Sequence, residues 1–329
     1  MFPLFRELTF DITEARPHNM ELIKTFKTVF LTAKRIAISF LLIICVMTYA
    51  NAQKEADSKI EGVQIGTITY SYRSMPDQSL TGILNYVKMS GISSVELMGT
   101  QVEQYAGIPQ TKDAEVLKKW RSTVSMKKFK EVGKMFKDHG VGIHILKLGS
   151  HKWSDIEIDY AFKVCKALGA KGITMEISEE AAKRMAPFAE KHKLYVIFHN
   201  HSQPGMPGFS FEKFLSYDPK LMLNLDVGHY YGATGENPCN VLKRLHDRIV
   251  SIHIRDKTGP EASSPNKNRQ FGDGQTPVVE MVQLIRNKKW PIYCDIELEY
   301  PIPKGSDAVT EVKKCVDYCR VALMADGQK

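Results

Sequence analysis

Several kinds of sequence motif are absent from this chain, and the absences narrow its function. Its six cysteines never form a Cys-x-x-Cys pair, which argues against a zinc ribbon. Its 45 lysines and arginines are scattered rather than gathered in one block, so a formal net charge of +8 gives no sign of a nucleic-acid-binding face. No internal repeat, low-complexity tract or linker divides the chain. A small-molecule enzyme or binding protein is therefore favoured.

The N-terminal 52 residues have the layout of a secretory signal peptide. The basic flank consists of Lys24, Lys27, Lys34 and Arg35. An uncharged run, IAISFLLIICVM at 36–47, follows it and leads to the A-x-A cleavage pattern at 50–52. This run is shorter than the roughly 20 residues that a membrane-spanning helix needs, which favours cleavage over a stable membrane anchor. We expect an exported protein, periplasmic or secreted, with an N-terminal extension and signal peptide over 1–52 and a leader over 53–60.

Residues 61–325 alternate between short apolar runs and longer amphipathic stretches. The apolar runs cover 63–70, 94–98, 141–148, 172–177, 194–199, 221–226, 249–254 and 292–298. Runs of this kind are typical of strands buried on both faces. Helical patterns lie between them, at 80–90, 113–139, 154–168, 178–192, 211–216, 238–247, 277–287 and 306–324.

Eight strands that alternate with eight helices predict a single α/β domain, a (β/α)8 TIM barrel. The main alternative is a doubly wound sheet, which usually carries a glycine-rich phosphate loop after its first strand. Here the first strand runs into the sequence TYSYR at 69–73, which contains no glycine. The barrel is therefore preferred.

Carboxylates and imidazoles gather where the last five predicted strands end. They are Glu176, His199, His201, Asp226, His229, His253, Asp295, Glu297 and Glu299. A barrel builds its active site from these strand ends, and charged groups are seldom buried unless they are paired or bind a metal. A shared divalent cation explains the accumulation. Mixed histidine and carboxylate ligation suits Mn, Zn, Fe or Co better than Mg or Ca.

Four short segments follow one another in an order that resembles a known family. They are LDVGH at 225–229, IHIRD at 252–256, FGDGQTP at 271–277 and IELE at 296–299. Together they resemble the xylose-isomerase-like TIM barrels, which comprise sugar phosphate isomerases and epimerases, inosose dehydratases and a related endonuclease branch. The likeness extends over about residues 60–325. It implies an enzyme that binds a metal and a small sugar or polyol.

The resemblance implies that Asp226, His253 and Glu297 hold the metal. The family's first ligand, a glutamate on the fifth strand, is replaced here by His199. Two explanations remain open: His199 or His201 binds the metal itself, or Glu176 on the neighbouring strand supplies the missing carboxylate. We favour Glu176 as the fourth ligand.

The same reasoning assigns roles in catalysis and substrate binding. The expected catalytic groups are His199, Glu176 and Glu297, and the expected substrate contacts are His201, His229 and Arg269. The leading expectation is an isomerase or epimerase that removes a proton next to a sugar carbonyl and forms an enediolate. The alternative is a lyase or dehydratase acting on a keto-sugar or 3-keto-glycoside, because family members with histidine at the fifth strand resemble those enzymes.

Two other functions are less favoured by the sequence. A nuclease would carry an additional histidine on the second strand, which here ends ELMG at 96–99, and an exported protein suits DNA repair poorly. A non-catalytic sugar-binding protein has no need for a converging set of metal ligands. The oligomeric state, a homo-oligomer included, is left open.

Overall fold

The structure, a computed structural model, describes residues 57–325. The expected signal peptide over 1–52 lies outside the described residues. Among the residues that are described, no helix has the length and apolar character needed to span a membrane.

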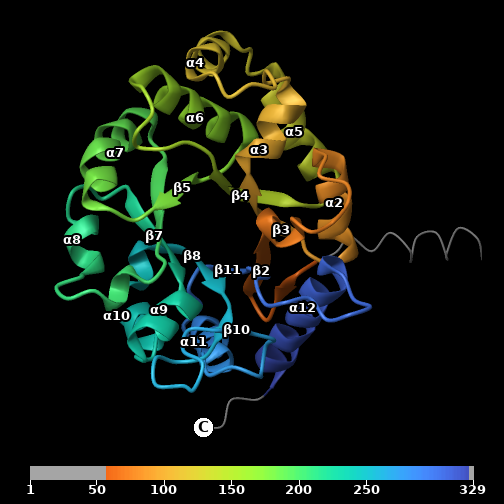
Figure 1. Ribbon diagram of the computed structural model, residues 1–329, viewed down its shortest axis with the longest axis vertical. Coiled ribbons are helices and arrows are strands. Elements are labelled where there is room, and N and C mark those ends of the chain that lie inside the picture. The colour runs from red at the N-terminus through yellow and green to blue at the C-terminus, as the bar shows by residue number, and fades with distance from the viewer. Residues whose placement is uncertain (1–56, 326–329) are drawn as a thin grey trace, which may run out of the picture. The chain divides into compact units, whose positions relative to one another are not determined.

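Eight parallel strands close into a barrel in the order in which they follow along the chain (Figure 1). They are β2 (Val63–Ile68), β3 (Ser94–Met98), β4 (Gly142–Lys147), β5 (Gly172–Glu176), β6 (Tyr195–His199), β7 (Leu221–Asp226), β8 (Ile249–Ile254) and β11 (Tyr293–Ile296). The circle is completed where β11 pairs with β2 and Asp295 lies opposite Gly66. A Cβ atom at residue 66 would lie 2.1 Å from Asp295 Oδ1, so glycine is required at this seam. The predicted (β/α)8 TIM barrel is confirmed, and each expected apolar run contains one of its strands.

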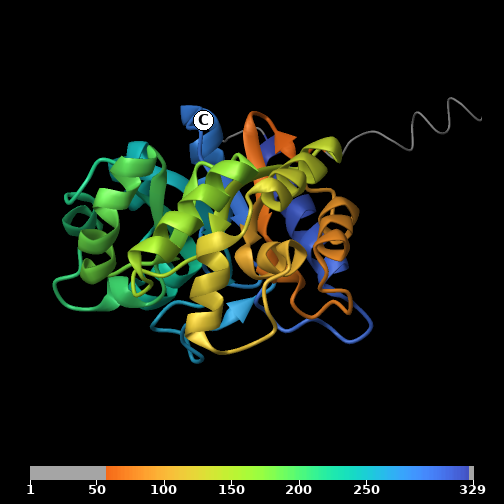
Figure 2. The ribbon, with the colours of Figure 1, turned by 90° about the horizontal axis from the view of Figure 1, so that it is seen from above.

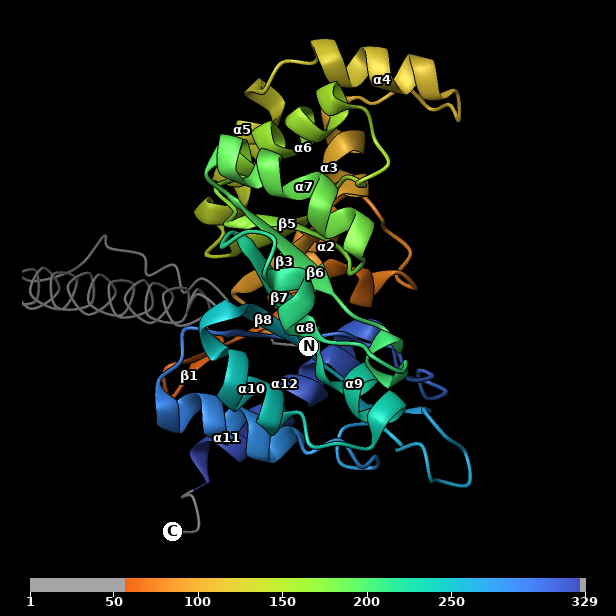
Figure 3. The same ribbon diagram turned by 90° about the vertical axis from the view of Figure 1, so that its left-hand side faces the viewer.

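Helices surround the strands on all sides (Figures 1 and 3). They are α2 (Leu80–Met89), α3 (Gly99–Ala106), α4 (Ala114–Thr123), α5 (Lys127–Asp138), α6 (Asp155–Leu168), α7 (Glu179–His192), α8 (Phe211–Leu215), α9 (Val227–Thr234), α10 (Cys239–Leu245), α11 (Val278–Lys288) and α12 (Ala308–Met324). Except for α4, which has no buried residue, their apolar faces pack on the outside of the strands and form one continuous buried core. Burial of this surface is the main force that holds the barrel and its helices together.

The prediction of a single helix over 113–139 is wrong, because the chain forms α4 and α5 instead. The hydroxyl of Thr123 donates a hydrogen bond to the carbonyl of Lys119 at 3.0 Å, and Val124 turns to an extended conformation. Serine, threonine and valine are weak helix formers, and the hydroxyls compete for backbone groups. Their accumulation at 122–125 therefore ends one helix before the next begins.

Two helices that the sequence pattern did not predict begin directly at strand ends. Helix α3 follows β3, and α9 follows β7. The α9 sequence VGHYYGAT contains two glycines and gives no clear apolar period. Both helices lie on the side of the barrel where the strands end, so they shape the surroundings of the candidate site.

Part of the expected leader is built into the domain. Strand β1 (Lys59–Ile60) pairs antiparallel with β2, so that Ile60 lies opposite Val63. Ser58 is fully buried and donates a hydrogen bond to the carbonyl of Ile65 at 2.5 Å. The folded unit therefore begins before residue 61, at least from Ser58 onward.

A small antiparallel ribbon covers the end of the barrel where β8 finishes. It joins β9 (Asp256–Lys257) to β10 (Asn268–Arg269). In Figure 2, β10 and α4 project from the same end of the barrel, whereas α12 finishes toward the opposite end. The carboxylate of Asp256 accepts backbone hydrogen bonds from Gly272, Gly274 and Thr276, at 2.8, 3.0 and 3.1 Å. These contacts fix the FGDGQTP segment against the ribbon.

Candidate active site

Four buried side chains converge at the C-terminal ends of neighbouring strands. His199 ends β6, Asp226 ends β7, His253 lies near the end of β8, and Glu297 directly follows β11. One ligand-type atom from each of the four lies within 4.8 Å of the others. None of the four side chains is more than 7 % exposed. Three of the four are the metal ligands expected from the sequence.

An apolar layer supports this group from below. Ile145, Ile197, Met222 and Val250 form a buried cluster that is separate from the core between strands and helices. Ile197 precedes His199 by two residues, and Met222 precedes Asp226 by four, so each pair shares one face of its strand. The polar side chains therefore lie above an apolar plug that closes the barrel interior.

Several buried polar atoms of the group have no hydrogen-bond partner. They are His199 Nδ1, Asp226 Oδ2 and His253 Nδ1. Asp226 Oδ2 lies 2.7 Å from Arg255 Nε, and His253 Nδ1 lies 2.6 Å from Glu297 Oε2, but neither contact has hydrogen-bond geometry. Buried polar atoms nearly always have partners. These three unpartnered atoms, together with the nearby carboxylate of Glu297, fit a divalent transition metal such as Mn, Zn, Fe or Co.

Asp226 is oriented by the helix that begins after it. Its Oδ1 accepts a hydrogen bond from the backbone N–H of His229 at 2.6 Å and so caps α9. The side chain of Asn200 also accepts a hydrogen bond from the Asp226 backbone N–H at 3.0 Å. These contacts use Oδ1 and hold the residue in place, which leaves Oδ2 directed at the group.

The charges of the group depend strongly on its neighbours. Burial lowers the pKa of His253, but the carboxylates of Glu297 and Glu96 outweigh burial and raise it well above the usual value. Burial raises the pKa of Glu297, but the charges of Arg255 and His253 bring it well below the usual value. Burial and the nearby charge of His253 lower the pKa of His199 well below its usual value, so this imidazole is neutral at pH 7. A neutral imidazole is the form that binds metals.

Arg255 contacts three carboxylates at this end of the barrel, those of Asp226, Glu297 and Glu299. Only 3 % of the residue is exposed, and its Nη2 donates to Glu297 Oε2 at 2.5 Å. Its other terminal nitrogen donates to Glu299, and its Nε faces Asp226. In the sequence, Arg255 stands out only as part of the IHIRD segment at 252–256. Its burial next to three carboxylates, visible only in the structure, makes it part of the site.

Glu176 lies beside the four-residue group rather than within it. It forms a second cluster with His199 and His201, and nearly half of its side chain is exposed. Its two oxygens lie 3.0 Å from Lys147 Nζ and 3.2 Å from His201 Nδ1. In the described structure it is His199, not Glu176, that completes the set formed by Asp226, His253 and Glu297. The arrangement favours the alternative in which the imidazole of the fifth barrel strand is the ligand.

His229 connects this rim to a buried lysine. Its ring centre lies 4.8 Å from that of His201, and its Nδ1 lies 3.4 Å from Lys257 Nζ. Lys257 is only 3 % exposed, and among residues 57–325 no carboxylate lies within 4.0 Å of its ammonium group. Burial, followed by the charge of Arg255, lowers the pKa of Lys257. The lysine therefore offers donor hydrogens that the described protein groups do not use.

Arg269, the remaining substrate contact expected from the sequence, lies at the outer edge of the site. Arg269 is exposed on β10, opposite Asp256 in the ribbon, and no described residue forms a hydrogen bond or ion pair with its side chain. The loop that carries it begins at the end of β8, so it rises above the group without joining it.

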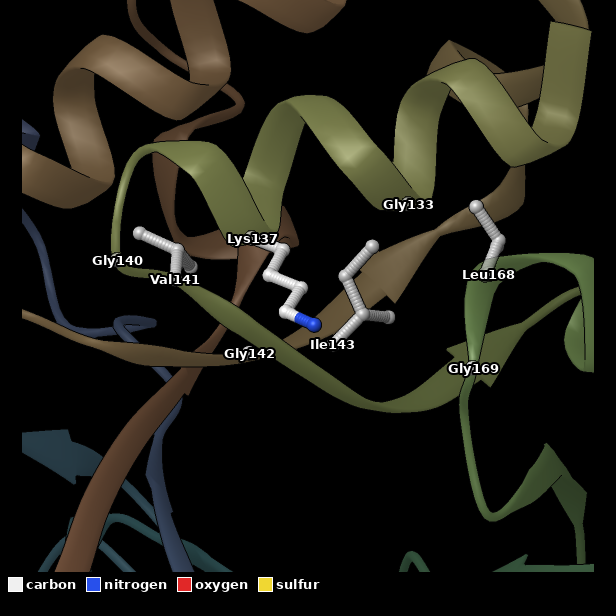
Figure 4. A pocket seen from close by; sticks show the side chains of 8 residues that line it. All are labelled: Gly133, Lys137, Gly140, Val141, Gly142, Ile143, Leu168 and Gly169. Carbon is white, nitrogen blue, oxygen red and sulfur yellow. The ribbon is translucent and has the colours of Figure 1, made fainter.

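Two cavities lie outside the four-residue group. One, of about 290 Å³, opens between the segment after β2 and the segment after β11, where Arg73 and Glu299 line it. The other, of about 450 Å³, lies against α5 and the start of β4, and includes Lys137 and Gly140 (Figure 4). Its lining contains no imidazole or carboxylate, so it offers no ligand set for a metal.

Comparisons with known proteins identify the family to which this barrel is related. Residues 84–319 match the family described as xylose isomerase-like TIM barrel. An inosose dehydratase from Mesomycoplasma hyopneumoniae is 25 % identical over 158 residues, which are 43 % of this chain and 52 % of that protein. The chain thus spans about half the length of this curated relative.

Two solved structures share the fold. A sugar phosphate isomerase/epimerase from Parabacteroides distasonis superposes with a TM-score of 0.56 at 18 % identity, covering 80 % of this chain and 96 % of that one. A probable 3-DHS dehydratase from Bacillus anthracis gives 0.57 at 16 % identity, covering 78 % and 98 %. At these identities the two likenesses show that the fold is shared. Because the family match extends over most of its length, this chain belongs to the xylose isomerase-like TIM barrel family.

Proposed function

We propose that this protein is a divalent-metal-dependent enzyme that removes the proton next to the carbonyl group of a keto-sugar or a cyclic keto-polyol. The observation that carries the proposal is the buried, convergent group of His199, Asp226, His253 and Glu297, in which the first three each have an atom without a hydrogen-bond partner. When bound there, a divalent cation would stabilise the negative charge that develops on the substrate oxygen as the proton leaves. Its place at the C-terminal ends of the strands is where barrel enzymes carry their active sites.

The proton-accepting group that the geometry favours is His201. Glu176 Oε2 faces its Nδ1 at 3.2 Å, while Lys147 holds the other oxygen of Glu176 at 3.0 Å. A carboxylate in this position selects the tautomer with hydrogen on Nδ1, which leaves Nε2 free to take a proton. The ring centre of His201 lies 4.9 Å from that of His199, so the base borders the ligand group.

Lys257 suits the opposite role, that of a proton donor. Its ammonium group is buried, uses one long hydrogen bond to His229, and has a lowered pKa because of burial. In an elimination, His201 takes the proton from carbon, the bond from the next carbon to its oxygen breaks, and Lys257 gives a proton to the departing oxygen. Water or an alcohol leaves, and an unsaturated ketone remains.

We favour elimination as the outcome of this chemistry. The resemblance implies that epimerases of this family use two metal-bound glutamates as the pair that exchanges protons. One of the two lies on the fifth strand, where this chain has His199. Without that carboxylate, the pair that exchanges protons on the two faces of a sugar is incomplete. The similarity to an inosose dehydratase supports the same choice.

Isomerisation or epimerisation is the second candidate. It is supported by the presence of two neighbouring proton-carrying pairs beside the ligand group, His201 with Glu176 and His229 with Lys257. Either pair could return the proton to a different face or to the adjacent carbon. Both outcomes begin with the same proton removal.

Proton exchange followed by NMR tests the proposal. The full chain would be loaded with Mn²⁺, freed of excess metal, and incubated in D2O with an inosose, a 3-keto-glucoside and free hexoses. Deuterium uptake with loss of water or aglycone is the expected result, and uptake with a new epimer or ketose would select the second candidate. A protein that keeps no metal and exchanges no proton would refute both. Glu103→Gln is the control, because Glu103 is a buried carboxylate that belongs to none of the ligand groups.

The N-terminal sequence also bears on where the protein acts. We propose that the mature protein lies outside the cytoplasm and acts on an unphosphorylated substrate, because phosphosugars are mainly cytosolic. Support comes from the basic flank, apolar run and cleavage pattern within residues 24–52. N-terminal sequencing of the protein recovered from a periplasmic or culture-medium fraction tests this. A chain found uncleaved in the cytoplasm would refute it.

A further inference from the structure

A further buried carboxylate, outside the ligand group, lies behind His253. Glu96 belongs to β3, and no part of it is exposed. Its Oε2 lies 2.6 Å from His253 Nε2, on the side of the imidazole away from the free Nδ1. A buried carboxylate is costly unless hydrogen bonds and charges compensate for its loss of water, so its contacts define what it does.

Donors from two other strands fix the orientation of Glu96. The hydroxyl of Thr174, on β5, donates to Oε1 at 2.5 Å, and the amide of Asn224, on β7, donates to Oε2 at 2.9 Å. The amide is itself oriented, because Ser251 donates to its oxygen at 2.7 Å. Each contact joins an acceptor to a donor, and the carboxylate has no freedom to turn.

These contacts decide which nitrogen of His253 can bind a metal. Two groups approach His253 Nε2: Glu96 Oε2 at 2.6 Å and the amide nitrogen of Asn224, which can only donate, at 2.9 Å. The amide also donates to Glu96 Oε2, and the contact with the carboxylate is the shorter one. Because an ionised carboxylate can only accept hydrogen bonds, Nε2 carries the hydrogen that points at Glu96. In the neutral imidazole Nδ1 then holds the lone pair, and it is directed at Glu297 and the ligand group. We propose that Glu96 is a positioning residue that holds His253 with Nε2 protonated and Nδ1 presented to the metal. This rests on the metal site of the proposed function.

Glu96 is poorly placed to be a ligand of a separate ion. It does lie close to His253 and Asp295, which together could form a three-residue group. However, Asp295 Oδ2 is occupied by His144 Nε2 at 2.8 Å, which leaves only its Oδ1 without a partner, and His144 Nδ1 is bonded to Ser94 at 2.9 Å. Both Glu96 oxygens accept hydrogen bonds from uncharged or imidazole donors. The geometry is that of a carboxylate behind a metal-binding histidine, an arrangement whose loss usually weakens metal affinity by about 10- to 100-fold.

Cobalt binding provides the test. The full chain and its Glu96→Gln variant would be titrated with Co²⁺ while the visible absorption of the bound ion is recorded. We expect binding by the variant to weaken by about 10- to 100-fold, with an altered absorption band because the imidazole is no longer held in one orientation. Glu103→Gln, which removes a different buried carboxylate, should bind Co²⁺ as the unaltered protein does.

A second measurement needs no variant of Glu96. In the Zn²⁺-loaded full chain, long-range ¹H–¹⁵N NMR identifies the protonated nitrogen of each histidine, and His253→Asn assigns the signal. Hydrogen on Nε2 and zinc on Nδ1 is the expected result. Hydrogen on Nδ1, or equal Co²⁺ affinity and spectra for Glu96→Gln and the unaltered protein, would overturn the role of Glu96 while leaving the metal site intact. Failure of the unaltered protein to bind either ion would overturn the metal site as well.

Discussion

Asp226 caps the helix that carries His229, with its Oδ1 accepting the His229 backbone N–H at 2.6 Å. One carboxylate oxygen thereby stabilises α9, and the other faces the ligand group. The cap and the candidate ligand are two functions of one side chain. The short connection between β7 and α9 makes this possible, because the helix starts at the next residue.

Substitution of Asp226 should separate these two functions. The Asp226→Asn variant keeps the cap of α9, because asparagine is as good a cap as aspartate, but its neutral amide is a poor ligand. Asp226→Asn should weaken Co²⁺ binding by about 100-fold or more. Asp226→Ala should also lose the cap, and with it about 1 kcal/mol of unfolding free energy relative to Asp226→Asn. Metal titration and urea unfolding of metal-free protein measure the two effects. Unaltered metal affinity in Asp226→Asn would contradict the ligand assignment.

Removal of Arg255 should destabilise the metal-free protein. Arg255 is buried next to Asp226, Glu297 and Glu299, and Arg255→Met leaves these carboxylates without their cation. Loss of one partner of a buried ion pair costs about 3–5 kcal/mol. Added Mn²⁺ should restore part of the stability, because it binds the folded state. Urea unfolding measures both effects.

The matched control for Arg255 is Arg244. Its side chain is 54 % exposed and pairs with Glu212 on the surface. Arg244→Met should change the unfolding free energy by less than about 1 kcal/mol, and Mn²⁺ should stabilise this variant as much as it stabilises the unaltered protein. Equal losses in the two variants would contradict the account of Arg255.

Lys257 should affect turnover more than stability. It is buried without a carboxylate partner among the described residues, so Lys257→Met removes an ammonium group that burial disfavours. The unfolding free energy should stay the same or rise. If Lys257 gives the proton to the departing oxygen, product formation should fall by about 100-fold or more while deuterium exchange at carbon continues. The exposed Lys267→Met is the control, and full turnover in Lys257→Met would exclude the role.

Low pH should weaken a cluster of ion pairs among the helices that surround the barrel. Arg121 Nη1 lies 3.1 Å from Glu157 Oε1, and its Nε lies 2.9 Å from Glu103 Oε1. Burial raises the pKa of Glu157, but hydrogen bonds from Ser154 and Arg121 bring it below the usual value of 4.5. A lowered pKa in the folded state stabilises the protein above pH 4.5. That contribution is lost as the pH falls through the lowered value.

The variant Glu157→Gln tests this pH dependence. The difference in unfolding free energy between the unaltered protein and Glu157→Gln should be largest near neutral pH and should shrink as the pH falls below about 5. Chemical unfolding at a series of pH values measures it. Glu115→Gln, at a side chain that is 82 % exposed, should show no such trend. A difference that grows as the pH falls would contradict the sign.

Much of the barrel could be predicted because its strands are short and buried on both faces. Segments such as LMLNLD at β7 and IVSIHI at β8 are apolar along most of their length, which marks them in the sequence. Helices whose sequence lacks a clear period were missed, as α9 shows. The break between α4 and α5 was not predicted, because 113–139 had the pattern of one long helix. The hydrogen bond from the hydroxyl of Thr123 to the carbonyl of Lys119, which accompanies the break, is visible only in the structure.

The sequence by itself determined the barrel, the strand ends that carry carboxylates and imidazoles, and three members of the ligand group, because these follow from local periodicity and from short motifs. Only the tertiary structure decided how those strand ends meet. The registers of β5, β6 and β7 bring His199 beside Asp226 and turn Glu176 toward Lys147 and His201. The same registers bury Glu96 behind His253 and Arg255 among three carboxylates. Such contacts join residues that lie between 25 positions apart, for Glu176 and His201, and 157 positions apart, for Glu96 and His253, and no local pattern specifies them.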